Sequence, residues 1–374
     1  MGNAMRVLIV GGGIAGLAMA RALELQGISS DLIERKDDAP QGGTGIYLPG
    51  NAARALKQLG LLDSVAVTAV PIHTQRILDS RGRQLSVTRT KDVWSSCGPC
   101  LALPREVLHA ALRSSLQDTR LRFGTSITDI RQIGKKSVTT CSDGTSGDYD
   151  VVIGADGIHS YVRHTLFPDA SPLYTGNVCW RFITGYSVAV DGWTVMLGNR
   201  MSLLAMPIDD DHLYVYADMV VGETDARRRM ARFPLNELKD QFAAPLSPLV
   251  ADLPTESQLH SGCVEQVVMT DWIKGNVVLI GDAAHASSPS MAQGAAMAME
   301  DALVLADSLT TASNIDDALA QYMNRRKPRV DWVQQQCVAR DSMRRLPGLG
   351  RSALLKLAGN ALYKRSYLPL TEPI

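Results

Sequence analysis

Residues 6–16 read Arg6-Val7-Leu8-Ile9-Val10-Gly11-Gly12-Gly13-Ile14-Ala15-Gly16, and residues 31–35 read Asp31-Leu32-Ile33-Glu34-Arg35. This pattern predicts a buried strand, a glycine-rich turn, a helix and a second strand that ends in an acid. Gly11, Gly13 and Gly16 have the G-x-G-x-x-G spacing, which permits a tight turn, close approach of the backbone to a pyrophosphate, and close packing of helix on strand. Glu34 stands about 20 residues beyond the last glycine, where an acid can bind a ribose 2′-hydroxyl. The sequence therefore predicts a dinucleotide at this turn and leaves open which one.

Arg35 has two possible roles beside Glu34. It can contact a 2′-phosphate, or it can cover an adenine face or form a surface ion pair, and we favour the second role. The helix that starts after the turn supplies unpaired N–H groups and partial positive charge, so phosphates are expected at its N-terminus.

Length and composition exclude several classes of protein. The chain has 374 residues, 45% hydrophobic and 20% charged, which is ordinary for a soluble globular protein of two domains or of one domain with a large insertion. Lys and Arg together number 38, as do Asp and Glu, so there is no overall bias toward nucleic acid or an anionic membrane. No run approaches ~18 apolar residues, and glycines interrupt the N-terminal apolar run, so we expect a cytoplasmic protein without a membrane span or signal peptide.

The six cysteines are too few and too scattered for a disulfide scaffold. Cys97-Gly98-Pro99-Cys100 has the C-x-x-C spacing, but no helix-forming run follows it, so a turn with two free thiols is favoured over a redox pair. No cluster of His, Cys, Asp and Glu has metal-ligand spacing, so no metal site is predicted. Residues 349–364 are apolar and basic at helical spacing, which favours an ordinary docked C-terminal helix over one that lies on a membrane.

The order of elements predicts an α/β fold. A nucleotide-binding domain is expected from residues 1–71, 102–175 and 273–340, and a substrate-binding antiparallel sheet from residues 72–101 and 176–272 is inserted into it. Residues 341–374 are expected to form a C-terminal helical segment. A helix is also predicted from Asn51 through Leu59, with Asn51 as its N-cap.

Two later segments repeat the pattern of a buried strand, an acid beside a glycine, and a helix start. They are Gly154-Ala155-Asp156-Gly157 and Ile280-Gly281-Asp282, the second followed by Gln293-Gly294-Ala295. With the N-terminal motif, they resemble the group A flavoprotein monooxygenases, the aromatic-ring hydroxylase family with the para-hydroxybenzoate-hydroxylase-like fold, over residues 6–330. The segment Gly43-Thr44-Gly45-Ile46 and the pair Trp180-Arg181 are similar to the branch that acts on salicylate, urate or alkylquinolones.

The resemblance implies a Rossmann-like FAD-binding domain and a role for each matching residue. Glu34 would bind the adenosine ribose, Ile127 the adenine, Asp282 the ribityl chain, and the backbone from Ala292 to Ala295 would face the isoalloxazine. Asp156 would serve both FAD and the nicotinamide, or would only stabilise a turn. Arg105 would reach the flavin side, or would be a solvated first-turn arginine. The implied cofactor residues are Gly11, Gly13, Ala15, Gly16, Glu34, Arg35, Gly45, Arg105, Ile127, Asp156, Asp282, Ala292, Gly294 and Ala295.

Ala292 departs from the family pattern, in which a glycine precedes Gln293 and Gly294. Because alanine restricts φ and adds a methyl group, this departure could alter the placement or mobility of the flavin.

The resemblance also implies the reaction. NAD(P)H would reduce the flavin, O₂ would add to it, and a flavin C4a-hydroperoxide would hydroxylate an aromatic or heteroaromatic small molecule. The candidate substrate residues between the inserted sheet and the flavin are Trp180, Arg181, Phe182, Met206, Tyr216, Met219 and Pro289.

Arg181 could pair with a phenolate or carboxylate, or equally be part of a structural ion pair. Trp180 is of a type more often found in a core, and His285 is expected to pack or cap rather than act as a base. The sequence identifies no general base, no preference between NADH and NADPH, and no oligomeric state. Alternatives are an epoxidase or decarboxylating monooxygenase on the same scaffold, or a flavin-bound reductase or sensor that does not oxygenate.

Overall fold

A six-stranded sheet forms the centre of the nucleotide-binding domain in the computed structural model, which describes residues 5–37, 44–186, 188–250 and 259–374. The strand order is β18-β19-β12-β1-β2-β8, and the pairs from β19 to β8 are parallel. The strands are β1 (Val7–Val10), β2 (Ser30–Ile33), β8 (Arg120–Arg122), β12 (Val151–Gly154), β18 (Ile273–Lys274) and β19 (Val277–Leu279). β1, β12 and β19 are buried throughout because they are apolar on both faces, as central parallel strands are.

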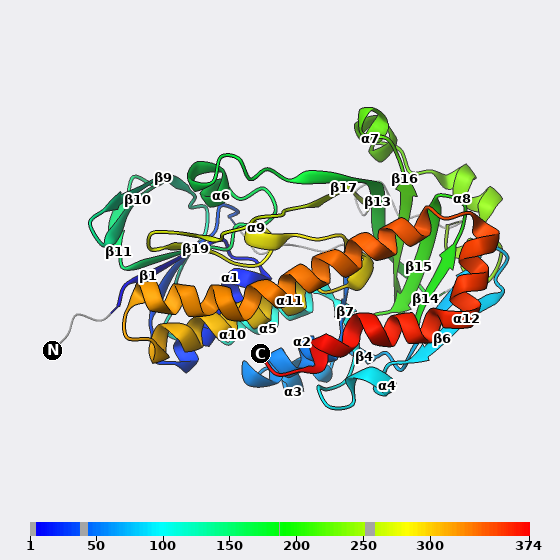
Figure 1. Ribbon diagram of the computed structural model, residues 1–374, viewed down its shortest axis with the longest axis horizontal. Helices are drawn as coiled ribbons and strands as arrows, with labels where there is room; N and C mark the ends of the chain where they lie inside the picture. The colour runs from blue at the N-terminus through cyan, green and yellow to red at the C-terminus, as the bar shows by residue number, and fades with distance from the viewer. Residues whose placement is uncertain (1–4, 38–43, 187, 251–258) are drawn as a thin grey trace.

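Small residues allow helices to pack closely beside this sheet. α1 (Ile14–Leu25) contacts α10 (Gly294–Thr311), and α10 contacts both α2 (Gly50–Gln58) and α11 (Ile315–Arg344). Figure 1 shows α10 and α11 in yellow and orange, running together across one side of the sheet. Ala18, Ala22, Ala302 and Ala306 are buried, and their short side chains bring the helix axes together. α5 (Arg105–Ser114) contacts α1 through a face that includes Leu108 and Leu112.

The remaining elements of this half are short. One three-stranded sheet contains β9 (Ile127–Ile133), β10 (Lys136–Cys141) and β11 (Ser146–Tyr149), and another contains β3 (Gly45–Leu48), β7 (Leu101–Pro104) and β4 (Val70–Pro71). The short helices are α3 (Leu62–Ala66), α4 (Lys91–Trp94), α6 (Tyr161–Leu166), α9 (Asp282–His285) and the 3₁₀ turn η3 (Pro289–Met291).

A seven-stranded sheet forms the other half, in the order β17-β13-β16-β15-β14-β5-β6. Its strands are β5 (Thr74–Asp79), β6 (Gln84–Arg89), β13 (Leu173–Gly185), β14 (Trp193–Leu197), β15 (Met201–Pro207), β16 (His212–Val220) and β17 (His260–Gln266). β5 pairs parallel to β14, and the other neighbours are antiparallel. Residues from both segments predicted for the sheet domain therefore meet in one sheet, although Val93, Trp94 and Leu101 belong to the core of the first half.

The two faces of the seven-stranded sheet have different neighbours. One face carries a second hydrophobic core with α7 (Glu223–Met230), α8 (Leu235–Gln241) and the 3₁₀ turn η1 (Ser247–Val250). The other face lines a cavity toward α9, η3 and α11. The cavity therefore lies on the face of the sheet that is turned toward the half with the six-stranded sheet.

The C-terminal segment is a docked helix followed by a short turn. α12 (Gly348–Tyr367) packs on β6 at Gly359, where an added Cβ would lie 2.6 Å from Ser86 Oγ, and η4 (Leu368–Thr371) follows it. Leu355 and Tyr363 of this helix are buried, whereas Leu349 and Leu357 are exposed. No helix in the described ranges has both the length and the apolar character that crossing a membrane requires.

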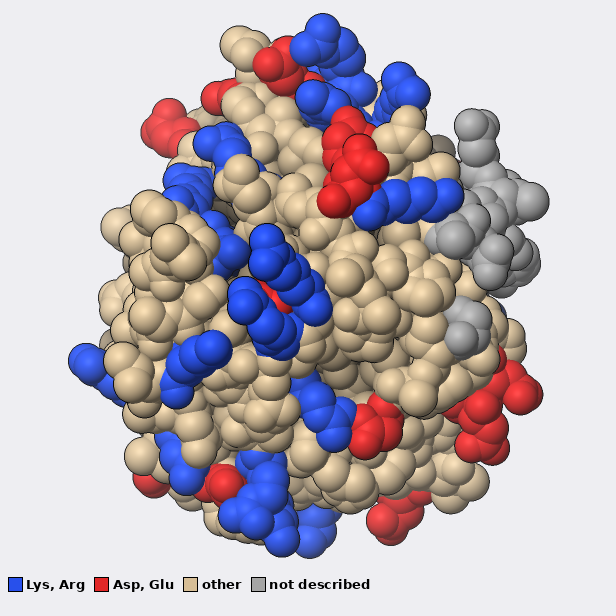
Figure 2. Space-filling view, turned by 90° about the vertical axis from the view of Figure 1, so that its right-hand side faces the viewer, with Lys and Arg blue, Asp and Glu red and all other residues tan. Residues whose placement is uncertain are grey.

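The surface carries charges of both signs. Figure 2 shows one end of the molecule, where basic and acidic side chains interrupt a largely uncharged surface. This mixture on the visible face agrees with the equal numbers of acidic and basic residues in the chain.

Candidate functional site: two cavities that meet at one arginine

Two cavities meet beside the start of α5. The nucleotide cavity, about 380 Å³, lies over the carboxyl ends of β1, β2 and β12. The substrate cavity, about 330 Å³, lies between the seven-stranded sheet and the segment from α9 to the start of α10. Arg105 lines both cavities, so one elongated ligand could extend past it from one into the other. Carboxyl ends of parallel strands are where ligands bind in open α/β sheets.

The three motif glycines have the geometry that their predicted roles require. Gly11 has φ +111°, and an added Cβ would lie 2.5 Å from the carbonyl oxygen of Ala155. At Gly16 an added Cβ would lie 1.9 Å from the carbonyl oxygen of Gly11, so the helix could not pack there with any larger residue. At Gly13 an added Cβ would meet no atom within 4 Å, which leaves this backbone open to the nucleotide cavity. The turn is therefore shaped to admit a pyrophosphate.

Glu34 is held in a fixed orientation at the edge of the nucleotide cavity. Its carboxylate accepts hydrogen bonds from the N–H groups of Gly12 (2.7 Å) and Lys36 (3.0 Å). His109, which the sequence analysis did not single out, lies with Nε2 2.8 Å from the carbonyl oxygen of Gly12. Burial lowers the pKa of His109, and because a carbonyl can only accept, the hydrogen of the neutral ring is on Nε2. His109 therefore supports the glycine-rich turn from behind.

Other predicted nucleotide residues also line this cavity, namely Arg35, Ile127 and Asp156. Asp156 has a clear structural role as well. It accepts hydrogen bonds from Ser160 Oγ (2.5 Å) and from the N–H groups of Tyr161 (2.7 Å) and Val162 (3.1 Å), at the start of α6. Burial raises the pKa of Asp156. Asp156 therefore stabilises this turn, which was one of the two roles predicted for it.

Asp282 is positioned by an unusual backbone conformation. Gly281 before it has φ +58° and ψ −143°, a region open essentially only to glycine, and an added Cβ would lie 2.9 Å from Cβ of Ala15. Asp301 accepts hydrogen bonds from the N–H of Gly281 (2.9 Å) and lies 2.6 Å from Nε2 of His285. His285 therefore stabilises this turn, in agreement with its predicted packing role, and Asp282 is left exposed toward the substrate cavity.

The loop between η3 and α10 forms the wall next to Asp282. Pro289, Ala292, Gly294 and Ala295 all line the substrate cavity, and an added Cβ at Gly294 would have Asp282 Oδ1, at 3.9 Å, as its nearest neighbour. Ala292 adopts the left-handed conformation, with φ +49° and ψ +39°. An L-residue in this conformation costs roughly 1–2 kcal/mol, so the alanine at the position where the family has glycine strains the loop.

The opposite wall of the substrate cavity is the seven-stranded sheet. Arg181, Met206 and Tyr216 line it, as do Gly45 of β3 and Tyr214. An added Cβ at Gly45 would lie 2.5 Å from Cβ of Tyr214, so a glycine is needed where β3 meets this sheet. Burial raises the pKa of Tyr214 and of Tyr216, so both phenols stay neutral near pH 7.

Three of the predicted substrate residues lie on the other face of the sheet. Successive residues of a strand point to opposite sides, so Trp180 and Phe182 face away from the cavity that Arg181 lines. Trp180 is fully buried, donates from Nε1 to the carbonyl of Met230 (3.1 Å) and packs edge-on against Phe233. Met219 also belongs to this second core. These side chains stabilise the sheet domain and do not reach the cavity.

Arg181 and Arg344 differ in their partners although both line the substrate cavity. Arg344 forms an ion pair with Asp218, which also accepts a hydrogen bond from Ser202 Oγ (2.5 Å). Among the described residues Arg181 has no ion-pair or hydrogen-bond partner, and its Nε is buried. Arg181 is therefore not part of a structural ion pair among the described residues. The arginine of this cavity that does form one is Arg344, with Asp218.

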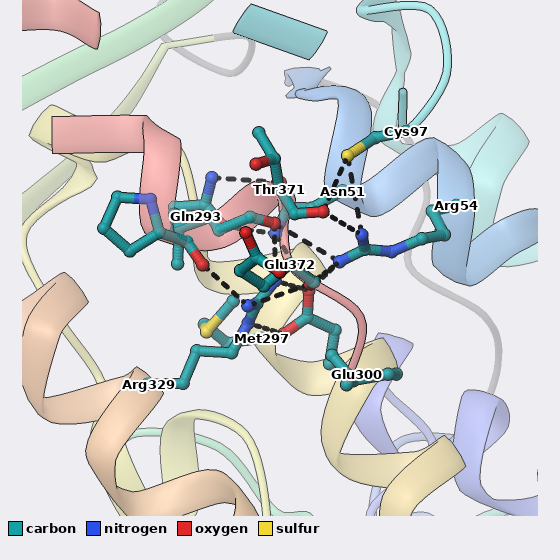
Figure 3. Close-up of polar contacts among 12 residues, drawn as sticks. Asn51, Arg54, Cys97, Gln293, Met297, Glu300, Arg329, Thr371 and Glu372 are labelled. Carbon is teal, nitrogen blue, oxygen red and sulfur yellow. Dashed lines mark hydrogen bonds and ion pairs between the residues drawn. The ribbon is translucent and has the colours of Figure 1, made fainter. Parts of the chain in front are cut away.

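A buried polar network joins α2 to the loop before α10 (Figure 3). Asn51 lies inside α2, which has Pro49 at its N-cap, so the prediction that Asn51 caps this helix was wrong. Its Nδ2 donates to Gln293 Oε1 (2.9 Å) and Glu300 Oε1 (3.0 Å), and its Oδ1 accepts from Gln293 Nε2 (3.2 Å). Arg326 donates to Glu300 at 2.7 Å, and all of these side chains are buried. The side chain of Gln293, next to the strained Ala292, is thus fixed from α2.

The same network binds the C-terminal turn. Arg54 and Arg329 each donate to main-chain carbonyls within residues 369–372, and Arg329 also pairs with Glu300 at 2.7 Å (Figure 3). Cys97 Sγ lies 3.5 Å from Arg54 Nη1 and from the carbonyl oxygen of Thr371. Cys97 and Cys100 are free, and burial raises the pKa of Cys100 to about 11, so it is a poor nucleophile near pH 7.

Within the described ranges, no group of three or more His, Cys, Asp and Glu side chains is arranged to hold a metal ion.

A glycine-rich turn between a buried parallel strand and a helix, with a cavity at its mouth, is the arrangement found in dinucleotide-binding proteins. Residues 4–337 match the family described as "FAD binding domain", and the chain belongs to that family. It is 34% identical over 343 residues to "2-heptyl-3-hydroxy-4(1H)-quinolone synthase" of Pseudomonas aeruginosa, covering 89% of this chain and 87% of the relative. It is 31% identical to "Aurachin C monooxygenase/isomerase" of Stigmatella aurantiaca, covering 86% and 85%.

A solved structure has the same fold. The crystal structure of Klebsiella pneumoniae HpxO complexed with FAD and uric acid covers 99% of this chain and 97% of its own, with a TM-score of 0.86 at 23% identity. The predicted fold class, the membership in the FAD-dependent monooxygenases and FAD as cofactor are confirmed.

Proposed function

We propose that the protein uses FAD, NAD(P)H and O₂ to hydroxylate an aromatic or heteroaromatic small molecule as a single-component enzyme. The observation that carries the proposal is the substrate cavity itself. It has the Asp282–Ala295 wall on one side and a sheet with the unpaired Arg181 on the other. The names of the relatives support the choice of a quinolone-like or related ring.

The residues that would hold FAD follow from the shape of the two cavities. Gly11, Gly13 and the start of α1 would bind the pyrophosphate, and Glu34 would bind the ribose. Arg105 would contact the cofactor where it passes from one cavity into the other. Asp282 and the backbone of residues 292–295 would take the part of the cofactor beside the substrate. When bound, FAD supplies the activation of O₂ at the expense of NAD(P)H.

The protein's own contribution is to bind and orient the substrate and to keep water away. Arg181 would bind an oxygen of the substrate, because a partly buried guanidinium whose Nε has no partner gains most from a negatively charged or strongly polar acceptor. Tyr214 and Tyr216 would act as neutral hydrogen-bonding groups, since burial keeps both protonated. Neither phenol is therefore suited to remove a proton from the substrate near pH 7.

A panel of phenols, quinolones and related rings tests the proposal. NAD(P)H oxidation should require O₂ and rise sharply with the right compound, and the product should contain one additional oxygen atom. NAD(P)H oxidation that no compound stimulates, with no oxygenated product, would support the flavin reductase or sensor instead.

Arg181→Gln tests the assigned role of the unpaired cation. A hydrogen bond to a charged group contributes about 1.5–3 kcal/mol, so the Kd of the substrate should rise roughly 10- to 100-fold. Flavin content and the free energy of unfolding should stay unchanged, because Arg181 has no protein partner to lose. Arg344→Gln is the matched control and should lower stability, because it leaves Asp218 without its ion pair. A loss of stability in Arg181→Gln without a change in Kd would contradict the assignment.

A further inference from the structure

The helix α12 is docked by one face and carries an apolar stripe on the opposite face. Successive residues are about 100° apart around a helix, so residues four apart share a face and residues two apart point in roughly opposite directions. The docked face is buried at four positions with this spacing; they are Arg351, Leu355, Gly359 and Tyr363. The outer stripe is exposed at each of its four positions; they are Leu349, Ala353, Leu357 and Ala361.

The two leucines of the outer stripe are surrounded by solvent. Leu349, at 91%, and Leu357, at 89%, are the most exposed large apolar side chains in the part of the chain that the structure describes. A helix that packs on a protein by one face normally presents charged and polar residues on the other. Docking by one face, as the sequence predicts for this segment, therefore does not explain the outer stripe of α12, which Figure 1 shows in red along the edge of the molecule. An apolar stripe of this kind is typical of a surface that a partner covers.

The charge around the outer stripe indicates what that partner is. Residues 342–371 contain six Lys and Arg residues and no Asp or Glu, although the formal net charge of the whole chain is zero. Three of these cations are engaged by the protein; they are Arg344, Arg345 and Arg351. The other three have no side-chain ion pair or hydrogen bond among the described residues; they are Lys356, Lys364 and Arg365. Lys356 precedes Leu357 directly, and Lys364 follows it by two helical turns, so both lie beside the stripe.

We propose that α12 docks the protein onto an anionic phospholipid membrane, lying in the plane of its surface. The outer stripe contacts the acyl chains, and the three unpaired cations contact lipid phosphates. Leucines flanked by Lys and Arg are typical of helices that lie in a membrane interface, where the apolar face reaches ~5–10 Å into the headgroup and acyl boundary. Long basic side chains can extend from such a helix back to the phosphates.

The same charges disfavour a second copy of this chain as the partner. Two copies of a chain usually meet through the same patch on each, related by a two-fold axis. An interface between two outer stripes would therefore bring the three unpaired cations of each copy together, and like charges that face each other oppose association. A surface of anionic phosphates neutralises them instead.

Vesicle binding tests the proposal with the full, FAD-loaded chain and needs no turnover. Sedimentation is compared between vesicles of phosphatidylcholine alone and vesicles that also contain phosphatidylserine. Each cation near an anionic surface strengthens binding about fivefold, so the mixed vesicles should bind the protein at least tenfold more tightly. The overall charge of the protein cannot produce this difference, because its formal net charge is zero. Absence of binding to the mixed vesicles, or equal binding to both kinds, would overturn the proposal.

Two neighbouring substitutions separate the apolar contribution from the electrostatic one. Leu357→Ser should weaken binding to both kinds of vesicle roughly tenfold, because a leucine no longer leaves water. Lys356→Gln should weaken binding about fivefold, and only to the vesicles with phosphatidylserine. Ile133→Ser and Lys135→Gln are the matched controls, at exposed positions at or just after the end of β9, at the other end of the molecule from α12 (Figure 1), and both should bind like the wild type.

The four variants should keep the flavin content and the urea unfolding midpoint of the wild type, because all four side chains are exposed. Equal weakening of vesicle binding in the variants of α12 and in the controls would refute the assignment to this helix. Analytical ultracentrifugation without lipid tests the competing partner. An oligomer that Leu357→Ser dissociates, without binding to vesicles, would assign the outer stripe to a second copy of the chain and overturn the membrane proposal.

Discussion

Removal of the Asn51 side chain should destabilise the protein through the groups that it leaves behind. Asn51→Ala deprives both polar atoms of the Gln293 side chain of their hydrogen-bond partners, and Gln293 is only 2% exposed. Each buried group without a partner costs about 1–3 kcal/mol, while Glu300 keeps Arg326 and Arg329 as donors. Two such groups lower the free energy of unfolding by about 2–6 kcal/mol.

A double-mutant cycle tests this reasoning more sharply than the single variant. In a Gln293→Ala background the glutamine side chain is already absent. The loss of unfolding free energy caused by Asn51→Ala should therefore be smaller there by about 1–3 kcal/mol. Urea unfolding of the four proteins, each with and without FAD, measures the coupling. The two single variants should also bind FAD more weakly, because Gln293 is part of the segment 292–295 that lines the substrate cavity.

The control is the same cycle with Arg131→Ala in place of Gln293→Ala, because Arg131 is an exposed residue of β9 whose side chain pairs with Asp129. That pair should be additive within about 0.5 kcal/mol. If Asn51→Ala and Gln293→Ala are equally additive, the hydrogen bonds between these side chains do not carry the stability that we assign to them.

Three further predictions concern single residues. Asp282→Ala should lose FAD or activity, because this carboxylate faces the substrate cavity beside Gly294; full flavin content and normal turnover would contradict its assignment. Ala292→Gly should raise the free energy of unfolding by about 1 kcal/mol in urea, because glycine accepts the left-handed φ without strain, whereas an unchanged or lower value would show that the loop is not strained. Stability should fall as the pH rises from about 9 to about 11, because burial raises the pKa of Cys100 from 9.0 to about 11 and the unfolded thiol loses its proton first. Cys100→Ala should reduce this alkaline loss when unfolding is compared across that range, and an identical decline in both proteins would refute the cause.

The nucleotide-binding half could be predicted from the sequence because its signals are local. The apolar strand before Gly11 and the strand that ends before Glu34 belong to one short unit, and the structure pairs them in parallel. The role predicted for Glu34 toward a ribose stays a prediction. The strands that end at Gly154 and before Gly281 carry the same local pattern, so their place in the central sheet could be predicted, whereas the order in which β12 pairs with β1 and β19 with β12 could not.

The substrate wall was less predictable because both faces of its sheet are buried. Alternation along β13 separates Trp180 from Arg181, but apolar residues on either face do not reveal which face meets the cofactor. The Asn51–Gln293 pair joins residues 242 positions apart, and no local pattern marks it. His109 was also missed, because a lone histidine on a helix gives no sign that it supports a distant turn.

The order of the central strands has a consequence for how the protein is made. β1, β12 and β19 are neighbours, yet they begin at residues 7, 151 and 277. While the ribosome is still synthesising the middle of the chain, β12 lacks its partner and one edge of the sheet stays open. Asp282 and the loop after it emerge later still. These walls of the cavities are therefore completed only after residue 295 has been synthesised. Long-range pairing of this kind slows folding and leaves unpaired, aggregation-prone strand edges exposed in the meantime. Ample riboflavin-derived cofactor and chaperones during expression should improve the yield of folded protein.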